Sequence, residues 1–91
     1  DVRTAGELEE KGVIDTGEAA LVHIALEEFI AQMENWPAKD AHLVVYCGSG
    51  HRSTMAMTVL WSYGYSNVSS LKGGFGGWAE AEYPVAEFVA P

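Results

Sequence analysis

The run Cys47-Gly48-Ser49-Gly50-His51-Arg52 holds the residue types in this chain that are best suited to chemistry. Cys47, the single cysteine, follows an apolar run and precedes a stretch of helical periodicity that opens at Ser53. A glycine-rich turn between a strand and a helix directs backbone N–H groups inward, and the helix N-terminus adds positive partial charge. Gly48 and Gly50 let the backbone curl closely around the sulfur. We therefore expect Cys47 to be a nucleophile with a lowered pKa, the alternative being a buried structural thiol.

The other side chains of this loop each have two readings. Arg52 could bind an anionic substrate, or it could brace the loop by pairing with a carboxylate such as Asp1, because a guanidinium fork suits both. His51 could hydrogen-bond a substrate, but we expect a solvated side chain at the loop tip. The hydroxyls of Ser49 and Ser53 could face the sulfur, although we expect Ser53 to be the N-cap of the following helix.

The composition is that of one small domain spanning residues 1–91. Of the 91 residues, 48% are hydrophobic and ten are glycine, which suits a compact α/β domain with tight connections. Thirteen acidic residues against five Lys and Arg give a formal net charge of −8. This balance argues against nucleic acid as a partner, because few cations are available to neutralise phosphates. We interpret the acidic residues as a contribution to solubility.

A single cysteine excludes an internal disulfide and a Cys-x-x-Cys redox pair. A structural zinc site would have to combine Cys47 with His23, His42 and His51, and no pair of these has the usual ligand spacing. We therefore expect no metal and no cofactor. No apolar run approaches the roughly 20 residues of a membrane span, and no signal peptide is present, which leaves the cellular compartment open.

Strand and helix signals alternate along the chain, which predicts an α/β domain with a small, mostly parallel central sheet flanked by helices. The elements expected in the first half are the end of a strand at residues 1–3, a short helix with a capping box at Thr4 and Glu7, a loop over residues 12–17, a strand or helix approach over residues 21–24, and a helix with one buried face over residues 26–33 that stops before Trp36-Pro37.

The elements expected in the second half are a central strand covered on both faces at Leu43–Tyr46, a helix ending at Gly64, a strand over residues 67–71, and a glycine-rich turn over residues 73–78 that leads into a short helix around residues 79–81. Ligands of parallel sheets bind at the carboxyl ends of strands, where Cys47 is placed. We expect Trp36, Trp61 and Trp78 to be packing residues and Arg3 to form a structural ion pair.

The sequence resembles the rhodanese (sulfurtransferase) family over nearly its whole length. The run from Val44 to Ser53 is similar to the family's active-site strand and loop, of the form Cys-x-x-Gly-x-Arg-Ser. Gly73, Gly74 and Trp78 resemble the family's closing Gly-Gly…Trp signature, and the chain opens on its Asp-Val-Arg. The family's Gly-His-Ile-Pro-Gly-Ala stretch appears over residues 12–19 without the His and the Pro.

This resemblance implies a rhodanese-like fold and sulfur transfer as the activity. The Cys47 thiolate would take a sulfane sulfur from a donor such as thiosulfate, become a persulfide, and pass the sulfur to a thiophilic acceptor such as cyanide. Residues 48–53 would bind the substrate or shape the loop. The implied partners are a small sulfur donor and a thiophilic acceptor, without a cofactor.

Two alternatives stay open. One is a non-catalytic rhodanese-like module that binds or senses within a larger protein, although the presence of Cys47 argues against it. The other is a phosphatase or arsenate reductase on the same scaffold. The family's phosphatase relatives place five residues between the Cys and the Arg, whereas four separate Cys47 from Arg52 here, so the shorter loop favours a sulfur atom over a phosphoryl group. Because the sequence opens at Asp1 without a Met, we expect a trimmed segment that lacks the strand before Asp1 and comes from a protein that could carry further domains.

Overall fold

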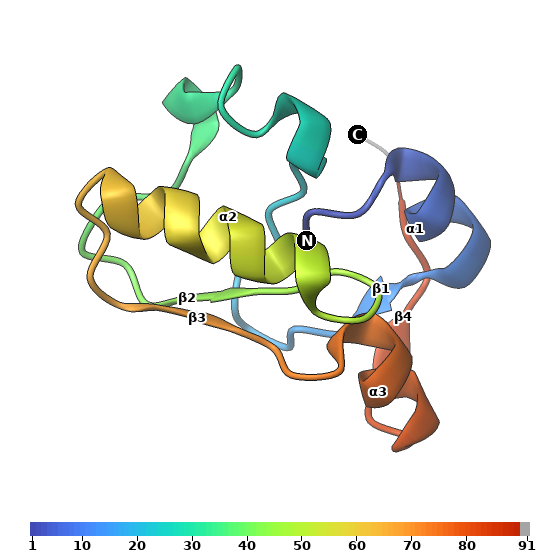
Figure 1. The fold of residues 1–91 in the computed structure, drawn as a ribbon. Helices are drawn as coiled ribbons and strands as arrows, with labels where there is room; N and C mark the ends of the chain where they lie inside the picture. The colour runs from blue at the N-terminus through green and yellow to red at the C-terminus, as the bar shows by residue number, and fades with distance from the viewer. Residues whose placement is uncertain (90–91) are drawn as a thin grey trace.

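The computed structural model describes residues 1–89, which form three α-helices, two short 3₁₀ helices and four short strands. In chain order these are α1 (Ala5–Lys11), β1 (Val13–Ile14), η1 (Leu26–Glu28), η2 (Met33–Asn35), β2 (Leu43–Val45), α2 (His51–Ser62), β3 (Val68–Ser70), α3 (Gly74–Glu80) and β4 (Val85–Ala86). Figure 1 shows α2 lying along β2 and β3, with α1 and α3 gathered near the end of β2 from which the chain enters α2. Within the described part of the chain, no helix combines the length and the apolar character that a membrane crossing needs.

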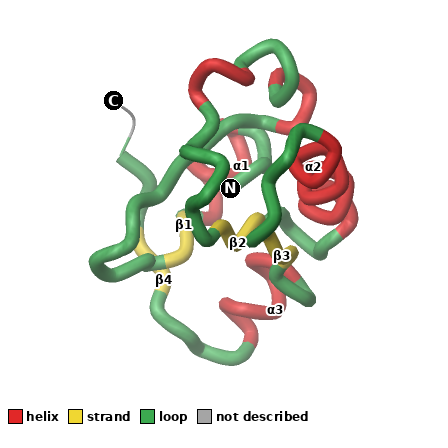
Figure 2. Tube along the Cα trace, turned by 90° about the vertical axis from the view of Figure 1, so that its left-hand side faces the viewer, coloured by secondary structure: helices red, strands yellow, loops and turns green. Residues whose placement is uncertain are grey.

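The strands form two pairs. β2 and β3 are parallel and place Leu43 opposite Val68 and Val45 opposite Ser70, whereas β1 and β4 are antiparallel. Figure 2 shows the two pairs near each other, with α2 to one side of them. The predicted α/β class and the parallel pairing are confirmed, although residues 1–89 form two separate pairs in place of one mostly parallel sheet. β1 lies inside a predicted loop, because its two residues give no local strand pattern and their partner lies at the other end of the chain.

Successive side chains at the end of β2 enter different parts of the core. Val45 and Cys47 join a cluster of buried residues that includes Leu60 of α2. Tyr46 packs instead with a second cluster that includes Phe75 of α3. This alternation follows from the two-residue period of a strand. It brings the sulfur under α2 and uses Tyr46 to attach α3 on the other side.

The caps of α1 and the end of α2 follow the prediction. Thr4 Oγ1 accepts a hydrogen bond from the Glu7 N–H at 3.3 Å, and Glu7 Oε1 accepts one from the Thr4 N–H at 3.2 Å, which completes the predicted capping box. Gly12 ends α1 with a φ of +84°. Gly64, at φ +96°, follows α2 at the position that favours glycine.

Arg3 forms the structural ion pair that the sequence predicts. Its Nη2 lies 2.8 Å from Asp1 Oδ2 and donates to the Gly12 carbonyl at 2.8 Å. The guanidinium also lies over the ring of Phe75, 4.2 Å from the ring centroid. Because both charged side chains are buried, losing either would leave an uncompensated charge in the interior. The pair therefore ties the first residues to α1 and α3.

The predicted helix over residues 26–33 is wrong. The structure has two single-turn 3₁₀ helices there, η1 and η2, with turns between them. Phe29 is buried at 7% exposure, whereas Ile30 is 55% exposed, so the apolar residues at helical spacing do not share one buried face. The Phe29 N–H donates to the Leu26 carbonyl, the tight i to i−3 pattern of a 3₁₀ turn.

The predicted strand end at residues 1–3 and the segment 21–24, predicted as a strand or a helix approach, belong to neither strand pair. Residues 1–3 run beside the end of β2, where the Val2 N–H donates to the Tyr46 carbonyl at 3.0 Å. Residues 21–24 follow beside them, where the Ile24 N–H donates to the Asp1 carbonyl at 3.1 Å. The Asp1 amino group also donates to the Val22 carbonyl at 2.9 Å, so the two segments lie side by side without extending either of the strand pairs in residues 1–89.

Two residues predicted to be buried are exposed. Val44 is 54% exposed, so β2 is not covered on both faces, and Trp61 is 51% exposed on α2. Trp36 packs as predicted, with its ring stacked on Phe29 at 4.8 Å. Trp78 is partly buried and packs against the second cluster.

Candidate active site

Cys47 is positioned by the end of β2 and the start of α2. The chain leaves β2 at Val45, and Cys47 lies two residues further on with only 1% of its surface exposed. Gly50 then adopts a φ of +117° and acts as the N-cap, so that α2 begins at His51. Only glycine takes this conformation without strain. The turn therefore folds back over the sulfur before the helix starts.

The sulfur of Cys47 lies among hydrogen-bond donors of this turn. The Gly50 N–H donates to Sγ at 3.0 Å, and Ser53 Oγ lies 3.6 Å from Sγ. Ser53 Oγ is also 2.7 Å from Ser70 Oγ on β3. The prediction that Ser53 caps the helix is wrong: Gly50 is the N-cap, and Ser53 is buried in the first turn of α2. Its hydroxyl thus points at the sulfur and accepts from the thiol or donates to the thiolate.

The pKa of Cys47 results from burial opposed by hydrogen bonding. Burial raises the pKa, but the side chain of Ser53 and the backbone N–H groups of Ser53, Gly50 and Ser49 stabilise the thiolate and together lower the pKa to about 7. Roughly half of the thiol is therefore ionised at neutral pH. A thiolate, and not a thiol, is the nucleophilic form of cysteine.

Arg52 is held in a bidentate ion pair by Glu7 of α1. Its Nη1 lies 2.6 Å from Glu7 Oε1 and its Nη2 lies 2.9 Å from Glu7 Oε2. The hydrogen bonds from Arg52 dominate in lowering the pKa of Glu7 to about 2, so the carboxyl is ionised at neutral pH. Arg52 thus pairs with a carboxylate, and this carboxylate is Glu7 and not Asp1. Asp1 is occupied by Arg3.

The first turn of α3 is hydrogen-bonded to the carbonyl groups of the Cys47 loop. The Phe75 N–H donates to the Cys47 carbonyl at 2.7 Å, and the Gly76 N–H donates to the Gly48 carbonyl at 3.0 Å. α3 begins at Gly74, earlier than the helix predicted around residues 79–81, so most of the predicted glycine-rich turn is helical. Gly73 is the N-cap of this helix and takes a left-handed conformation. The loop is thus hydrogen-bonded through its carbonyls on one side, while its N–H groups remain directed at the sulfur.

The remaining predicted site residues lie at the surface of the loop. His51 is exposed, as expected of a solvated loop tip, and Gly48 is partly buried beneath the Arg52 side chain. Ser49, whose hydroxyl the sequence allowed to face the sulfur, is exposed as well. Within residues 1–89 no group of three or more His, Cys, Asp or Glu side chains is arranged to hold a metal ion.

Four residues that contribute to the site were not predicted from the sequence. Glu7 carried the signal of a helix cap, which the structure bears out, and gave no sign of its second role as the partner of Arg52. Ser70 had no signal beyond its place in a short strand. Gly74 and Gly76 were part of a glycine-rich turn, whose close approach to a distant loop the sequence does not show.

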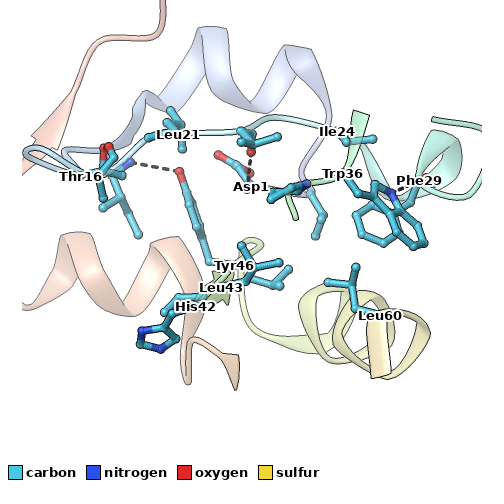
Figure 3. A pocket seen from close by; sticks show the side chains of 18 residues that line it. Asp1, Thr16, Leu21, Ile24, Phe29, Trp36, His42, Leu43, Tyr46 and Leu60 are labelled. Atoms are coloured by element: carbon cyan, nitrogen blue, oxygen red, sulfur yellow. Dashed lines mark hydrogen bonds between the residues drawn. The ribbon is translucent and has the colours of Figure 1, made fainter. Parts of the chain in front are cut away.

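A cavity of about 360 Å³ lies on another side of β2 and is separate from this site. Figure 3 shows Leu43 and Tyr46 on one wall, with Trp36 nearby and Leu21 opposite. Neither Cys47 nor any residue from 48 to 53 lines it. A small molecule in this cavity would not touch the thiol.

Comparison with known proteins gives a consistent family. The model of the rhodanese-like domain matches residues 1–81. The whole chain is 34% identical to a protein named sulfurtransferase from Allochromatium vinosum, 77% of which it covers. Over 63 residues, 69% of the chain, it is 38% identical to the thiosulfate sulfurtransferase GlpE of Haemophilus influenzae. The crystal structure of a rhodanese-related protein from Thermoplasma volcanium matches 97% of the chain, and 81% of that protein, with a TM-score of 0.82 and 30% identity.

Several of these relatives are longer than the matched part. The alignment covers 59% of the Haemophilus influenzae protein and about a third of two plant proteins, one from Arabidopsis thaliana and one from Raphanus sativus. The similarity therefore concerns the domain that contains the Cys47 loop, and the activity of a whole relative does not transfer with it.

Proposed function

The chain belongs to the rhodanese-like domain family, and on this basis we propose that it is a sulfurtransferase that carries a sulfane sulfur on Cys47. The observation that carries the proposal is the environment of the thiol. The lone cysteine sits in a turn whose Gly50 N–H donates to Sγ at 3.0 Å, and its pKa is lowered to about 7. Relatives named sulfurtransferases, at 34–38% identity, support the same activity.

In the first step the Cys47 thiolate attacks the outer sulfur of a donor such as thiosulfate. A sulfur–sulfur bond forms to Cys47, the sulfur–sulfur bond of thiosulfate breaks, and sulfite leaves with the bonding electrons. The enzyme then carries a persulfide anion. In the second step an acceptor such as cyanide attacks the terminal sulfur, leaves as thiocyanate, and restores the thiolate. No external oxidant or reductant is needed, because each step exchanges one nucleophile for another.

The loop supports both anions of this cycle. The N–H groups of residues 49, 50 and 53 that stabilise the thiolate are fixed by the turn and by the start of α2, so they need no rearrangement when charge develops on sulfur. The terminal sulfur of the persulfide would lie further toward the loop opening, where Ser49 and His51 are exposed. Donors that are already oriented lower the barrier more than donors that must first be ordered.

The spacing of the loop favours this activity over a phosphatase. Four residues lie between Cys47 and Arg52, and both terminal nitrogens of Arg52 are engaged by Glu7. A phosphoryl group needs a wider cradle with an arginine that is available to its oxygens. A non-catalytic binding module would not require a thiol with a lowered pKa.

The test is intact-protein mass spectrometry after incubation with thiosulfate. The reduced, folded protein should gain the mass of one sulfur atom, and digestion should place it on Cys47. Addition of cyanide should remove the added atom and release thiocyanate. Cys47→Ser should show neither the adduct nor thiocyanate, since covalent catalysis needs the nucleophile itself.

The absence of an adduct with several sulfane-sulfur donors would refute this function. That result, on protein shown to be folded by circular dichroism, would favour the binding module. An adduct that persists in Cys47→Ser would show that the sulfur is carried elsewhere on the protein.

A further inference from the structure

We propose that Glu7 is a specificity-determining residue of this site, which neutralises Arg52 and so favours singly charged organic sulfane-sulfur donors over the thiosulfate dianion. This inference rests on the proposed function and names the class of donor. Glu7 lies on α1, far from Cys47 in the sequence, and its side chain reaches the loop only in the folded protein.

The ion pair occupies the fork formed by the two terminal nitrogens of the Arg52 guanidinium, one of the edges through which arginine binds an anion. Both terminal nitrogens of Arg52 donate to Glu7, one to each carboxylate oxygen, at 2.6 and 2.9 Å. This fork is an arrangement by which arginine binds oxyanions, so a sulfonate or sulfate-like group cannot use it while Glu7 holds it. A dianionic donor would have to displace the carboxylate or approach it.

Glu7 is itself held from a second side. Its Oε1 accepts from the N–H and the Oγ1–H of Thr4, each at 3.2 Å, in addition to the bond from Arg52. The absent side chain of Gly48 leaves room for the pair, because a Cβ there would lie 3.2 Å from Arg52 Nη2 and 3.8 Å from Glu7 Oε2. The carboxylate is therefore fixed against the loop and cannot swing away without breaking the cap of α1.

Little other positive charge is available near the sulfur. Of the five basic residues, Arg3 is buried in its pair with Asp1, while Lys11 ends α1 and Lys39 lies near Gly64. Lys72 precedes Gly73 beside the loop, is exposed, and forms no ion pair with any residue that the structure describes. An exposed ammonium is strongly hydrated and screened by salt, so it binds an anion weakly.

The favoured donors carry the same sulfane sulfur with one charge less. For an organic thiosulfonate, the Cys47 thiolate attacks the outer sulfur, the sulfur–sulfur bond breaks, and the sulfinate leaves with the electron pair. For an organic persulfide, the leaving group is the thiolate. Both reactions give the same Cys47 persulfide that thiosulfate gives.

The test compares thiosulfate with methanethiosulfonate in the wild type, Glu7→Gln and a control, Glu10→Gln. Glutamine keeps the oxygen that caps α1 but removes the charge that holds Arg52. Glu10 lies on the same helix, is exposed and forms no ion pair in residues 1–89, so Glu10→Gln reports the effect of net charge alone. Glu7→Gln should raise kcat/KM for thiosulfate roughly three- to tenfold, mainly through KM, and for methanethiosulfonate clearly less.

The ratio of the two donors decides the outcome, because their leaving groups differ. A purely structural role of Glu7 would lower kcat/KM for both donors together. An equal change for both donors in Glu7→Gln, or a gain that Glu10→Gln matches, would overturn the proposal.

A binding measurement keeps the test independent of turnover. In a Cys47→Ser background, calorimetry with thiosulfate should show tighter binding after Glu7→Gln by a similar factor. The double variant Glu7→Gln/Arg52→Gln should bind thiosulfate like the background protein. Removing both charges of the ion pair leaves the net charge of the site unchanged. Weaker binding by the double variant would show that Arg52 binds the donor and would refute the role of Glu7. If no sulfur adduct forms with either donor, the proposed function fails, while the calorimetry still tests the role of Glu7.

Discussion

Ser53 is the side chain that most directly controls the charge on Cys47. Its Oγ lies 3.6 Å from Sγ, and it is held there by Ser70 Oγ at 2.7 Å and by the Gly50 carbonyl at 3.1 Å. Burial of the thiol by itself would raise its pKa, so the low pKa depends on the side chain of Ser53 and on the backbone N–H groups of residues 49, 50 and 53. A thiolate that forms only because of specific contacts is sensitive to their loss.

We predict that Ser53→Ala raises the pKa of Cys47 from about 7 toward the value of roughly 8.5 found for a free cysteine. A higher pKa leaves less thiolate at neutral pH, so the rising limb of the rate–pH profile should shift to more alkaline pH. Thiolate absorbance followed against pH measures the shift. Activity at pH 6.5 should fall, and activity at pH 9 should stay close to that of the wild type.

Ser49→Ala is the matched control for this prediction. Ser49 contributes to the low pKa through its backbone N–H, which the substitution keeps, and its side chain is exposed. Its titration curve should therefore overlay that of the wild type. Equal shifts in Ser49→Ala and Ser53→Ala would show that the hydroxyl of Ser53 is not the source of the effect.

For single residues, the sequence predicts where a functional side chain lies along the chain better than which side chain it contacts. The strand, glycines and helix around Cys47 are local signals, and they suffice to predict a thiol at a glycine-rich turn. The role of Ser53 was mistaken because the N-cap lies three residues earlier, at the left-handed Gly50. Glu7 could not be chosen as the partner of Arg52 in place of Asp1, since that choice depends on where α1 lies in the folded chain.

Among the secondary structure elements, α3 connects most directly to the loop. Its first residue, Gly74, has a φ of +59°, and a Cβ added there would lie 2.5 Å from the Cys47 carbonyl oxygen and 2.7 Å from the Gly48 carbonyl carbon. No side chain fits in this space. The close approach lets the N–H groups of Phe75 and Gly76 reach the loop carbonyls.

We predict that Gly74→Ala destabilises the protein by about 2–4 kcal/mol, from backbone strain and from the clash with the loop. Sulfur transfer should fall as well, because α3 must move away and the loop loses two hydrogen bonds. Urea unfolding measures the stability, and the rate of adduct formation by the folded fraction measures the activity.

Two glycine variants separate the causes of this effect. Gly17 also has a positive φ, +62°, but nothing lies within 4 Å of an added Cβ, so Gly17→Ala should show only the backbone strain, about 1–2 kcal/mol. Gly77, inside α3, has only one atom near an added Cβ, the Lys72 carbonyl oxygen at 4.0 Å, and should tolerate alanine. A loss in Gly74→Ala no larger than that in Gly17→Ala would contradict the steric role.

The elements that the sequence predicted are those with strong local signals. α1 has a complete capping box, α2 has a glycine at each end, and β2 is a continuous apolar run. The segment over residues 26–33 has the apolar spacing of a helix. Some of these apolar residues are buried and others are exposed, and the segment forms single-turn 3₁₀ helices and turns. β1 and β4 are two residues long, and only the folded chain brings them together.

At the scale of the whole molecule, the site lies at one end of the parallel strand pair, where α1, α2 and α3 meet (Figure 1). The fold agrees with that of a rhodanese-related crystal structure at a TM-score of 0.82. The chain carries a formal net charge of −8, and two of its five basic residues are neutralised in ion pairs. An anionic donor therefore approaches a protein of the same sign.

This charge predicts an unusual response to salt. Screening weakens the repulsion between like charges, so kcat/KM for thiosulfate should rise as potassium chloride is increased from about 20 to 200 mM, a range over which the screening length shortens from roughly 20 Å to below 10 Å. Methanethiosulfonate carries half the charge, and the slope of log kcat/KM should be about half as steep. Stopped-flow mixing at sub-saturating donor provides the measurement, and a fall of kcat/KM with salt would mean that the exposed Lys72 beside the loop outweighs the acidic surface at the point where the donor enters.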